Sequence, residues 1–255
     1  MTIISAYAAT TGKGTYPISS YPNGTYYTTS GGNCTSSHKY CKSYAGGKQC
    51  FAFAKYAYDQ YSHRSEWTNI SGDKYISGRK IDTLENFKKW MQNDIKYGSY
   101  VRLTIKGDDT TGHSFIFISA SSDGVKMYDA NYTGYCKVDT HTVPYKTLFD
   151  KYEGGKILEA YAHNFTKKLN YNNVSYHKIA CSSSGCTGYE ALESHTLKYT
   201  QLNSTSHTVT CTVCGYSATR PHVAKTTGSN KTCSQCGATG IIAGEGLASI
   251  EDENS

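Results

Sequence analysis

The chain has 255 residues and a formal net charge of +6, with 26 Lys and Arg against 20 Asp and Glu. Its hydrophobic fraction is 38%, it contains 24 Tyr and 24 Gly, and none of its apolar stretches reaches the length of about 18 residues that a membrane-spanning helix needs. Together these features exclude an integral membrane protein, a collagen and a coiled coil. Apolar burial must rely on tyrosine rings as much as on aliphatic side chains.

The positive charge is concentrated in the first part of the chain. Residues 1–169 carry 21 Lys and Arg against 14 Asp and Glu, whereas residues 170–255 carry 5 against 6. A basic first part favours approach to an anionic polymer such as a cell wall or nucleic acid. The second part lacks the basic face of a nucleic-acid-binding module. We therefore expect a secreted or cell-wall-associated monomer that binds no nucleic acid and does not insert into a membrane.

Local patterns predict an arm followed by two helices. Residues 1–43 are dominated by Gly, Ser, Thr, Tyr and Asn without a period, which predicts an extended, loop-rich arm. Residues 48–64 place apolar side chains at helical spacing and predict an amphipathic helix with Cys50 in its first turn. Asp82-Thr-Leu-Glu85 is typical of a capping box and predicts a second helix over residues 84–93.

The pattern then changes to the alternation of β-strands. A turn cluster is expected between Gly107 and Gly112, and the predicted strands cover residues 99–105, 113–119, 125–129, 135–138 and 156–162. Helices followed by a meander of strands predict an α+β fold. The predicted domains are the arm of residues 1–43, a core of residues 44–168, a Cys/His-rich domain of residues 169–240 and a disordered acidic tail of residues 241–255.

Four residues of the predicted core have the order and placement of a catalytic site. Cys50 begins a helix, where free N–H groups and the helix dipole favour a thiolate. His113 opens a strand after a turn and can pair with that thiolate. Asp129 and Asn131 lie two apart on the returning strand, so they share a face and either can orient the imidazole.

This pattern resembles the CHAP amidases and the related NlpC-like peptidases, which are papain-fold cysteine hydrolases that cut amide bonds in peptidoglycan. The resemblance covers residues 40–140 and rests on Gln49-Cys50, on His113-Ser and on Asp129-Ala-Asn131. It implies a papain-like core in which a helix carries the nucleophile and packs on an antiparallel sheet. It also implies that Cys50 is the nucleophile, that His113 is the general base and that Gln49 lies near the oxyanion. The family usually has Glu where this chain has Asp129, so the orienting residue stays open between Asp129 and Asn131.

Other interpretations of the same residues stay open at this stage. Cys50 can be a small buried hydrophobe, and His113 a polar residue at a turn. Cys34 and Cys41 are close enough in sequence to form a small disulfide, and Cys136 is then structural or disulfide-bonded. The alternative to a secreted hydrolase is a non-catalytic protein that binds glycan or cell wall through Tyr-rich loops.

The region from residue 177 to residue 236 is rich in metal-ligand residues. The spacing Cys-x2-Cys-x18-Cys-x2-Cys is that of a zinc ribbon, which predicts a structural zinc site at Cys211, Cys214, Cys233 and Cys236. We expect catalysis itself to need no cofactor. A second site is predicted at His177, Cys181, Cys186 and His195.

Two further arrangements of this region fit the sequence. Each His-Cys-Cys-His set can bind its own ion, the second set being His207, Cys211, Cys214 and His222. Alternatively, its six cysteines can form three disulfides. The region has too few aliphatic residues to hold a core alone, so a cross-link must stabilise it in either case.

Overall fold

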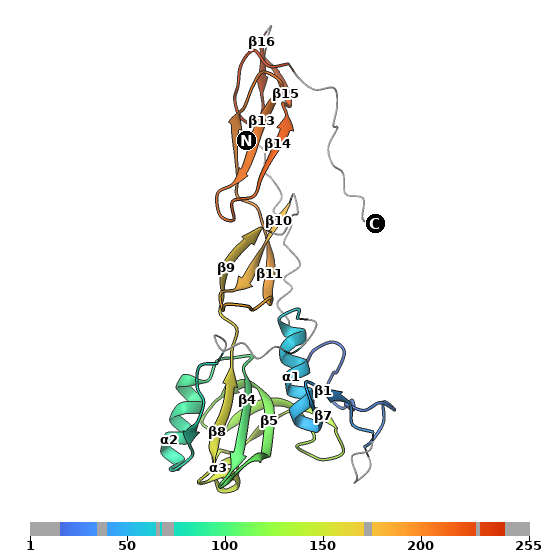
Figure 1. The fold of residues 1–255 in the computed structure, drawn as a ribbon, viewed down its shortest axis with the longest axis vertical. Helices are drawn as coiled ribbons and strands as arrows, with labels where there is room; N and C mark the ends of the chain where they lie inside the picture. The colour runs from blue at the N-terminus through green and yellow to red at the C-terminus, as the bar shows by residue number, and fades with distance from the viewer. Residues whose placement is uncertain are drawn as a thin grey trace. The chain divides into compact units, whose positions relative to one another are not determined.

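The computed structural model describes residues 16–34, 40–64, 67, 74–170, 175–227 and 230–242. The fold is mixed α+β, with few helices and mostly antiparallel sheets (Figure 1). Two compact units divide the chain. What we call the first unit contains the described residues of Thr11–Lys167 and Ile179–Ala191, and the second unit contains those of Lys168–Lys178 and Leu192–Ser255. Among the described residues, no helix is both long and apolar enough to cross a membrane.

A six-stranded sheet forms the centre of the first unit, in the order β3-β8-β4-β5-β6-β7. Each of its strands runs antiparallel to its neighbours in this order. They are β3 (Arg79–Lys80), β4 (Tyr100–Ile105), β5 (Asp108–Ala120), β6 (Val125–Ala130), β7 (Val138–Val143) and β8 (Lys156–Tyr161). Short strands β1 (Ser43–Tyr44) and β2 (Gly47–Lys48) pair with each other just before the first helix.

The two faces of this sheet carry separate hydrophobic clusters. Side chains of a strand alternate between faces, so Ile116 packs with α1 (Gln49–Tyr61) while Phe115 and Phe117 belong to the other cluster. That other cluster is covered by α2 (Leu84–Lys89), the π-helix η2 (Trp90–Asp94) and α3 (Tyr145–Tyr152). In Figure 1, α1 and α2 accordingly lie on opposite sides of the strands. Aromatic rings of the arm, including Tyr27, pack against α1.

Several predicted elements are confirmed, and others need correction. The helix over residues 48–64 is α1, and the strands over residues 99–105, 125–129 and 156–162 are β4, β6 and β8. The second helix is capped by Thr83, whose hydroxyl accepts from the Asn86 N–H at 3.2 Å, and it continues as η2.

Three further differences concern the strands and α3. Residues 108–112 of the turn predicted between Gly107 and Gly112 are already part of β5, because a bulge after Thr104 lets the pairing resume at once. The strand predicted at residues 135–138 only begins at Val138. Helix α3, which follows Pro144, was not predicted.

The remaining strands form three small sheets. One has the order β11-β10-β9, from β9 (Phe165–Asn170), β10 (Tyr176–Cys181) and β11 (Tyr189–Ser194). A second contains β12 (Leu197–Gln201), β13 (Ser206–Cys211) and β14 (Ser217–Pro221). The third is the hairpin of β15 (Ala224–Thr227) and β16 (Asn230–Cys233). Residues 243–255, most of the predicted acidic tail, lie outside the described residues.

Candidate active site and metal centres

Cys50 lies in the first turn of α1 as a half-buried free thiol. Helix α1 is fixed in place because Phe53, Ala54 and Ala57 are fully buried against the sheet. The chain enters this helix through Gly47, where a Cβ atom would lie 2.0 Å from the Phe51 ring. A larger residue at this position would displace the Phe51 ring in the first turn of α1.

His113 is buried on β5, directly after a second glycine that packing requires. A Cβ atom on Gly112 would lie 2.0 Å from the carbonyl oxygen of Leu103 on the neighbouring strand. Because side chains alternate along a strand, His113 emerges on the same face as Phe115. Asp129 emerges on the same face of β6 as Met127, which belongs to the same cluster as Phe115. The imidazole and the carboxylate therefore meet across the β5–β6 pair.

The carboxylate of Asp129 is shared by two histidines. Its Oδ2 lies 3.5 Å from Nε2 of His113 and 3.3 Å from Nε2 of His141, which is on β7. These are ion-pair distances without hydrogen-bond geometry. The other carboxylate oxygen, Oδ1, accepts from the backbone N–H of Tyr132 at 3.2 Å. Asp129, 1% exposed, therefore sits where it can hold the His113 ring.

Asn131 takes a different position from the one expected for a ring-orienting residue. Its backbone has φ +75°, so the chain turns away from the strand at this point. Its Nδ2 donates to Oε1 of Gln49 at 2.8 Å, and its Oδ1 accepts from the backbone N–H of Cys136 at 2.9 Å. The structure thus brings Asn131 to Gln49, the residue before Cys50, and Asp129 to His113.

The electrostatics favour a thiolate–imidazolium pair. Burial alone raises the pKa of the Cys50 thiol, but the charge of His113, its hydrogen bond and a backbone hydrogen bond at Ser114 lower that pKa below its usual value. Burial alone lowers the pKa of His113, whereas the charge of Cys50 and the contact with Asp129 raise it to about 10. Nε2 faces Asp129, which leaves Nδ1 as the ring nitrogen for the thiolate.

Two residues near this group were not found from the sequence. His141 lies in a strand with ordinary alternation, so its approach to Asp129 has no local signal. Tyr152 ends the unpredicted helix α3 and is buried, with a hydroxyl that has no hydrogen-bond partner among the described residues. Burial, the charge of Cys50 and the neighbouring Tyr132 raise the pKa of Tyr152.

A disulfide secures the segment that follows Asn131. Cys41 of the arm is bonded to Cys136, and the thiol of Cys34 lies 2.8 Å from the Cys41 sulfur. All three sulfurs are buried. The expected pairing of Cys34 with Cys41 is therefore wrong: Cys136, 95 residues away, is the partner. Since the N–H of Cys136 holds Asn131, this bond links the arm to the candidate site.

The metal-ligand residues of the second unit gather differently from the prediction. Cys211 and Cys214 do not meet Cys233 and Cys236; each pair lies with two histidines instead. The two groups are His177, His195, Cys211 and Cys214, and His207, His222, Cys233 and Cys236. The prediction of one site with four cysteines is therefore wrong. The prediction that each His-Cys-Cys-His stretch, residues 177–195 or residues 207–222, binds its own ion is wrong as well. None of the six cysteines between residues 181 and 236 is disulfide-bonded in the described structure, so the three-disulfide alternative is also wrong.

The physical reason is that each Cys-x2-Cys turn lies beside histidines from an earlier part of the chain and not beside the other turn. Cys211 ends β13 and Cys214 follows in the turn, where Gly215 has φ +74° and donates its N–H to the Cys211 carbonyl at 3.1 Å. Cys233, Cys236 and Gly237 repeat this turn after β16, with φ +73° at Gly237 and a distance of 3.0 Å. Two separate turns of this kind make two separate sites.

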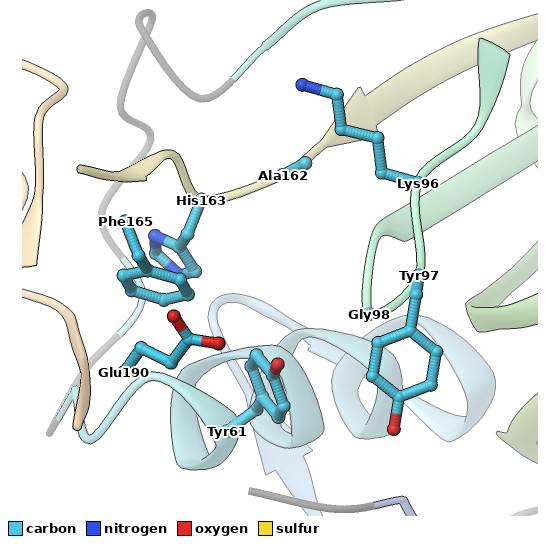
Figure 2. Close-up of a pocket in the computed structure, with 8 residues that line it drawn as sticks. All are labelled: Tyr61, Lys96, Tyr97, Gly98, Ala162, His163, Phe165 and Glu190. Atoms are coloured by element: carbon cyan, nitrogen blue, oxygen red, sulfur yellow. The ribbon is translucent and has the colours of Figure 1, made fainter. Parts of the chain in front are cut away.

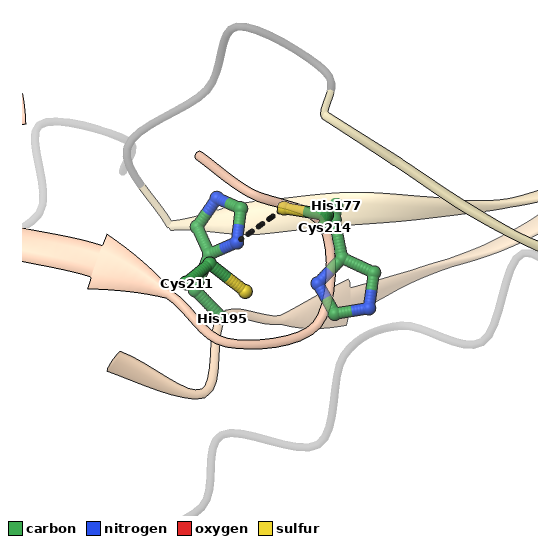
Figure 3. Close-up of side chains that lie close together, drawn as sticks. All are labelled: His177, His195, Cys211 and Cys214. Carbon is green, nitrogen blue, oxygen red and sulfur yellow. Dashed lines mark hydrogen bonds between the residues drawn. The ribbon is translucent and has the colours of Figure 1, made fainter. Parts of the chain in front are cut away.

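The first group, whose four side chains are drawn in Figure 3, has the donor set of a zinc site. Its ligand atoms lie within 4.8 Å of one another, and Nδ1 of His195 is 3.5 Å from the Cys214 sulfur. The Nε2 of His177 contacts Glu193 at 3.2 Å, and Glu193 is paired with Lys168. Such a carboxylate holds the ring of a metal ligand so that its other nitrogen faces the ion.

The second group matches tetrahedral zinc in its internal distances. Zn–S bonds of about 2.3 Å and Zn–N bonds of about 2.0–2.1 Å at tetrahedral angles place sulfur and nitrogen about 3.6 Å apart and two nitrogens about 3.4 Å apart. The sulfur–nitrogen distances are 3.7 Å for Cys233–His207 and 3.6 Å for Cys236–His222, and the two Nδ1 atoms are 3.3 Å apart. Nε2 of His222 is 3.0 Å from the carbonyl oxygen of Asn203, which leaves Nδ1 for the ion.

Comparisons with family models, with curated proteins and with solved structures found no match for this chain.

Proposed function

We propose that the protein is a cysteine hydrolase that cleaves amide or peptide bonds with Cys50 as nucleophile. The observation that carries the proposal is the pairing of a thiol of lowered pKa at a helix start with a buried histidine of raised pKa beside Asp129. A neutral thiol attacks poorly, whereas a thiolate is a strong nucleophile at neutral pH. We assign Asp129 as the residue that orients His113.

In the proposed reaction the Cys50 thiolate attacks the carbonyl carbon of the amide. The C–N bond then breaks as the His113 imidazolium gives its proton to the leaving nitrogen, which departs as the amine. The remaining thioester is hydrolysed by a water whose proton His113 accepts, and the C–S bond breaks to release the carboxylic acid. Each turnover returns Cys50 and His113 to their starting states.

Gln49 and the backbone of Cys50 are the proposed stabilisers of the oxyanion. Asn131 donates to Oε1 of Gln49 at 2.8 Å, which directs the Nε2 group of that side chain away from Asn131. An amide N–H beside the nucleophile can donate to the oxygen that becomes negative during attack. In this proposal Asn131 positions Gln49 and does not contact His113.

Peptidoglycan is the proposed substrate, and the cell exterior is the proposed location. The resemblance to CHAP and NlpC-like enzymes supports both, as does the excess of positive charge in residues 1–169. A papain-like core is part of the same proposal. It is supported by a helix that carries the thiol and packs on an antiparallel sheet that carries the histidine and the carboxylate. The Cys41–Cys136 disulfide supports an oxidising compartment.

The test compares the wild-type protein with the Cys50→Ala variant on purified peptidoglycan, with released muropeptides followed by mass spectrometry. Cys34→Ala is the control, because it removes another free thiol of the first unit. We expect release by the wild type and the control, and a loss of at least about 10³-fold for Cys50→Ala. Release by Cys50→Ala at the wild-type rate contradicts the proposal.

A second measurement does not depend on the choice of substrate. Iodoacetamide labelling at pH 6, mapped by peptide mass spectrometry, reports which thiols are ionised well below their usual pKa. We expect Cys50 to be labelled in the wild type and to lose this reactivity in His113→Ala. An unlabelled Cys50, together with sedimentation of the intact protein on cell wall without product, favours a non-catalytic wall-binding protein.

A further inference from the structure

The two metal-ligand groups of the second unit use ligands from successive copies of one sequence pattern. The copies are His177-x3-Cys181-x4-Cys186-x8-His195 and His207-x3-Cys211-x2-Cys214-x7-His222. The histidines of the first copy lie with the cysteines of the second, and the histidines of the second lie with Cys233 and Cys236. This offset explains why Cys233-x2-Cys236 needs no histidine after it. It leaves the first cysteine pair, Cys181 and Cys186, to be matched by a histidine from earlier in the chain.

His163, which follows β8, occupies that place. The ligand atoms of His163, Cys181 and Cys186 lie within 4.8 Å of one another, and all three residues belong to the first unit. Nδ1 of His163 is 3.4 Å from the Cys186 sulfur. This is close to the 3.5 Å, 3.6 Å and 3.7 Å of the two other groups and to the sulfur–nitrogen separation of about 3.6 Å around tetrahedral zinc.

Backbone hydrogen bonds hold these three residues together. The N–H of Ser182 donates to the carbonyl of Asn164 at 2.8 Å, which ties the residue after Cys181 to the residue after His163. The N–H of Cys181 donates to Gly188 at 2.9 Å, and the N–H of Cys186 donates to Ser183 at 3.1 Å. The turn that carries both sulfurs is therefore closed on itself and fixed beside His163.

Aromatic packing fixes the imidazole as well. The His163 ring stacks on Tyr58 of α1, with centroids 4.4 Å apart and an angle of 15°, and it stacks on Phe165 at 5.0 Å. His163 and Phe165 also form part of the wall of a cavity of about 300 Å³, together with Tyr61, Tyr97 and Glu190 (Figure 2). A histidine held on both faces presents its nitrogens in fixed directions, as a metal ligand requires.

We propose that His163, Cys181 and Cys186 bind a zinc ion, the first of three ions along the chain. Two thiolates and an imidazole are three of the four ligands that zinc takes in tetrahedral sites, and thiolates favour zinc over calcium or magnesium. The ion joins the segment after β8 to the turn between β10 and β11. It thereby stabilises the wall of the cavity that contains His163.

The test is the zinc content of the full chain, measured by native mass spectrometry and by elemental analysis. We expect three zinc ions in the wild type and two in each of His163→Ala, Cys186→Ser, Cys214→Ser and Cys236→Ser. The matched controls are His63→Ala and Cys34→Ser. His63 stacks on Tyr189 in the same unit, and neither control residue belongs to a group with His163. Both controls should keep three ions.

Thiol alkylation of the wild type covers the case of a variant that fails to fold. With zinc bound, Cys181 and Cys186 should resist alkylation, and chelation should expose both. A wild type with two ions, a His163→Ala variant with an unchanged count, or a Cys181–Cys186 disulfide overturns the proposal. Because the readout is ion content, a failure of the proposed hydrolysis leaves this result unaffected.

Discussion

The two units of this protein bury different kinds of side chain. The first unit has two clusters of aliphatic and aromatic residues, one on each face of its central sheet. In the second unit, the buried residues include His177, His207 and His222, which are at most 2% exposed. An imidazole without a partner is costly to bury, so histidines replace an apolar core only where something binds them. The first unit can fold by apolar burial, whereas we expect the second to depend on metal binding by its ligand groups.

Chelation gives the largest expected difference between the units. A structural zinc contributes roughly 10–16 kcal/mol of apparent binding free energy in small domains, which exceeds the stability of a typical domain. We expect EDTA to abolish hydrogen-exchange protection of β12–β14 while protection of β4–β6 remains. Cys34→Ser with EDTA is the control for non-specific thiol effects. If β12–β14 stay protected from hydrogen exchange after complete metal removal, the second unit does not depend on metal and the proposed difference between the units is wrong.

Within the first unit, Asp129 and Asn131 should differ in their effect on turnover. Asp129→Ala removes the carboxylate beside His113, and we expect kcat to fall by about 10²–10⁴-fold. Asn131→Ala leaves that contact in place and only releases Gln49, so a fall of about tenfold is expected. Steady-state kinetics on the same substrate decide between them. A larger loss for Asn131→Ala would instead make it the orienting residue.

Removal of the disulfide should weaken the first unit and leave the second unchanged. The Cys41–Cys136 bond closes a loop of 95 residues, so its loss should lower the free energy of unfolding by about 2–4 kcal/mol. Urea unfolding of the Cys41→Ala/Cys136→Ala protein, followed by tyrosine fluorescence, measures this loss. Turnover should also fall, because Cys136 holds Asn131. A wild-type midpoint in the double variant contradicts the structural role of the bond.

The dependence on pH sharpens the description of the ion pair. The pKa of Cys50 is lowered, so its contribution to stability is present above the ordinary thiol pKa and is lost as the pH falls through the folded-state value. The pKa of His113 is raised to about 10, so its contribution is present below pH 6.5 and is lost as the pH rises through 10. We expect turnover to decline above about pH 10, where His113 loses its proton.

The matched variant for this profile is Asp129→Asn. It removes a charge that raises the pKa of His113, so the alkaline decline should move to lower pH. Cys50→Ala removes the other raising charge, and an NMR titration of His113 in that protein should show a lower pKa than in the wild type. If the pKa of His113 is unchanged in both variants, the Cys50 thiolate and the His113 imidazolium do not form the ion pair described above.

Local patterns in the sequence determined much of the first unit. Helical periodicity located α1 with Cys50 in its first turn, and alternation located β4, β6 and β8. The order of Cys50, His113 and Asp129 along the chain singled out residues that the fold brings together, although His113 lies in the middle of β5 and does not open it. Such signals are readable because they depend on neighbours within a few residues.

The tertiary structure decided what depends on distant partners. Asp129 and Asn131 are equivalent in strand spacing, and only the positive φ of Asn131 sends it to Gln49 and leaves Asp129 with His113. Cys41 and Cys136 meet because the arm packs back on the sheet. The Cys-x2-Cys turns predict metal ligands, but their histidines lie 11 or more residues earlier in the chain and belong to the preceding copy of the pattern. The spacing of the cysteines predicts that a turn binds metal, whereas the tertiary structure decides which histidines lie beside that turn.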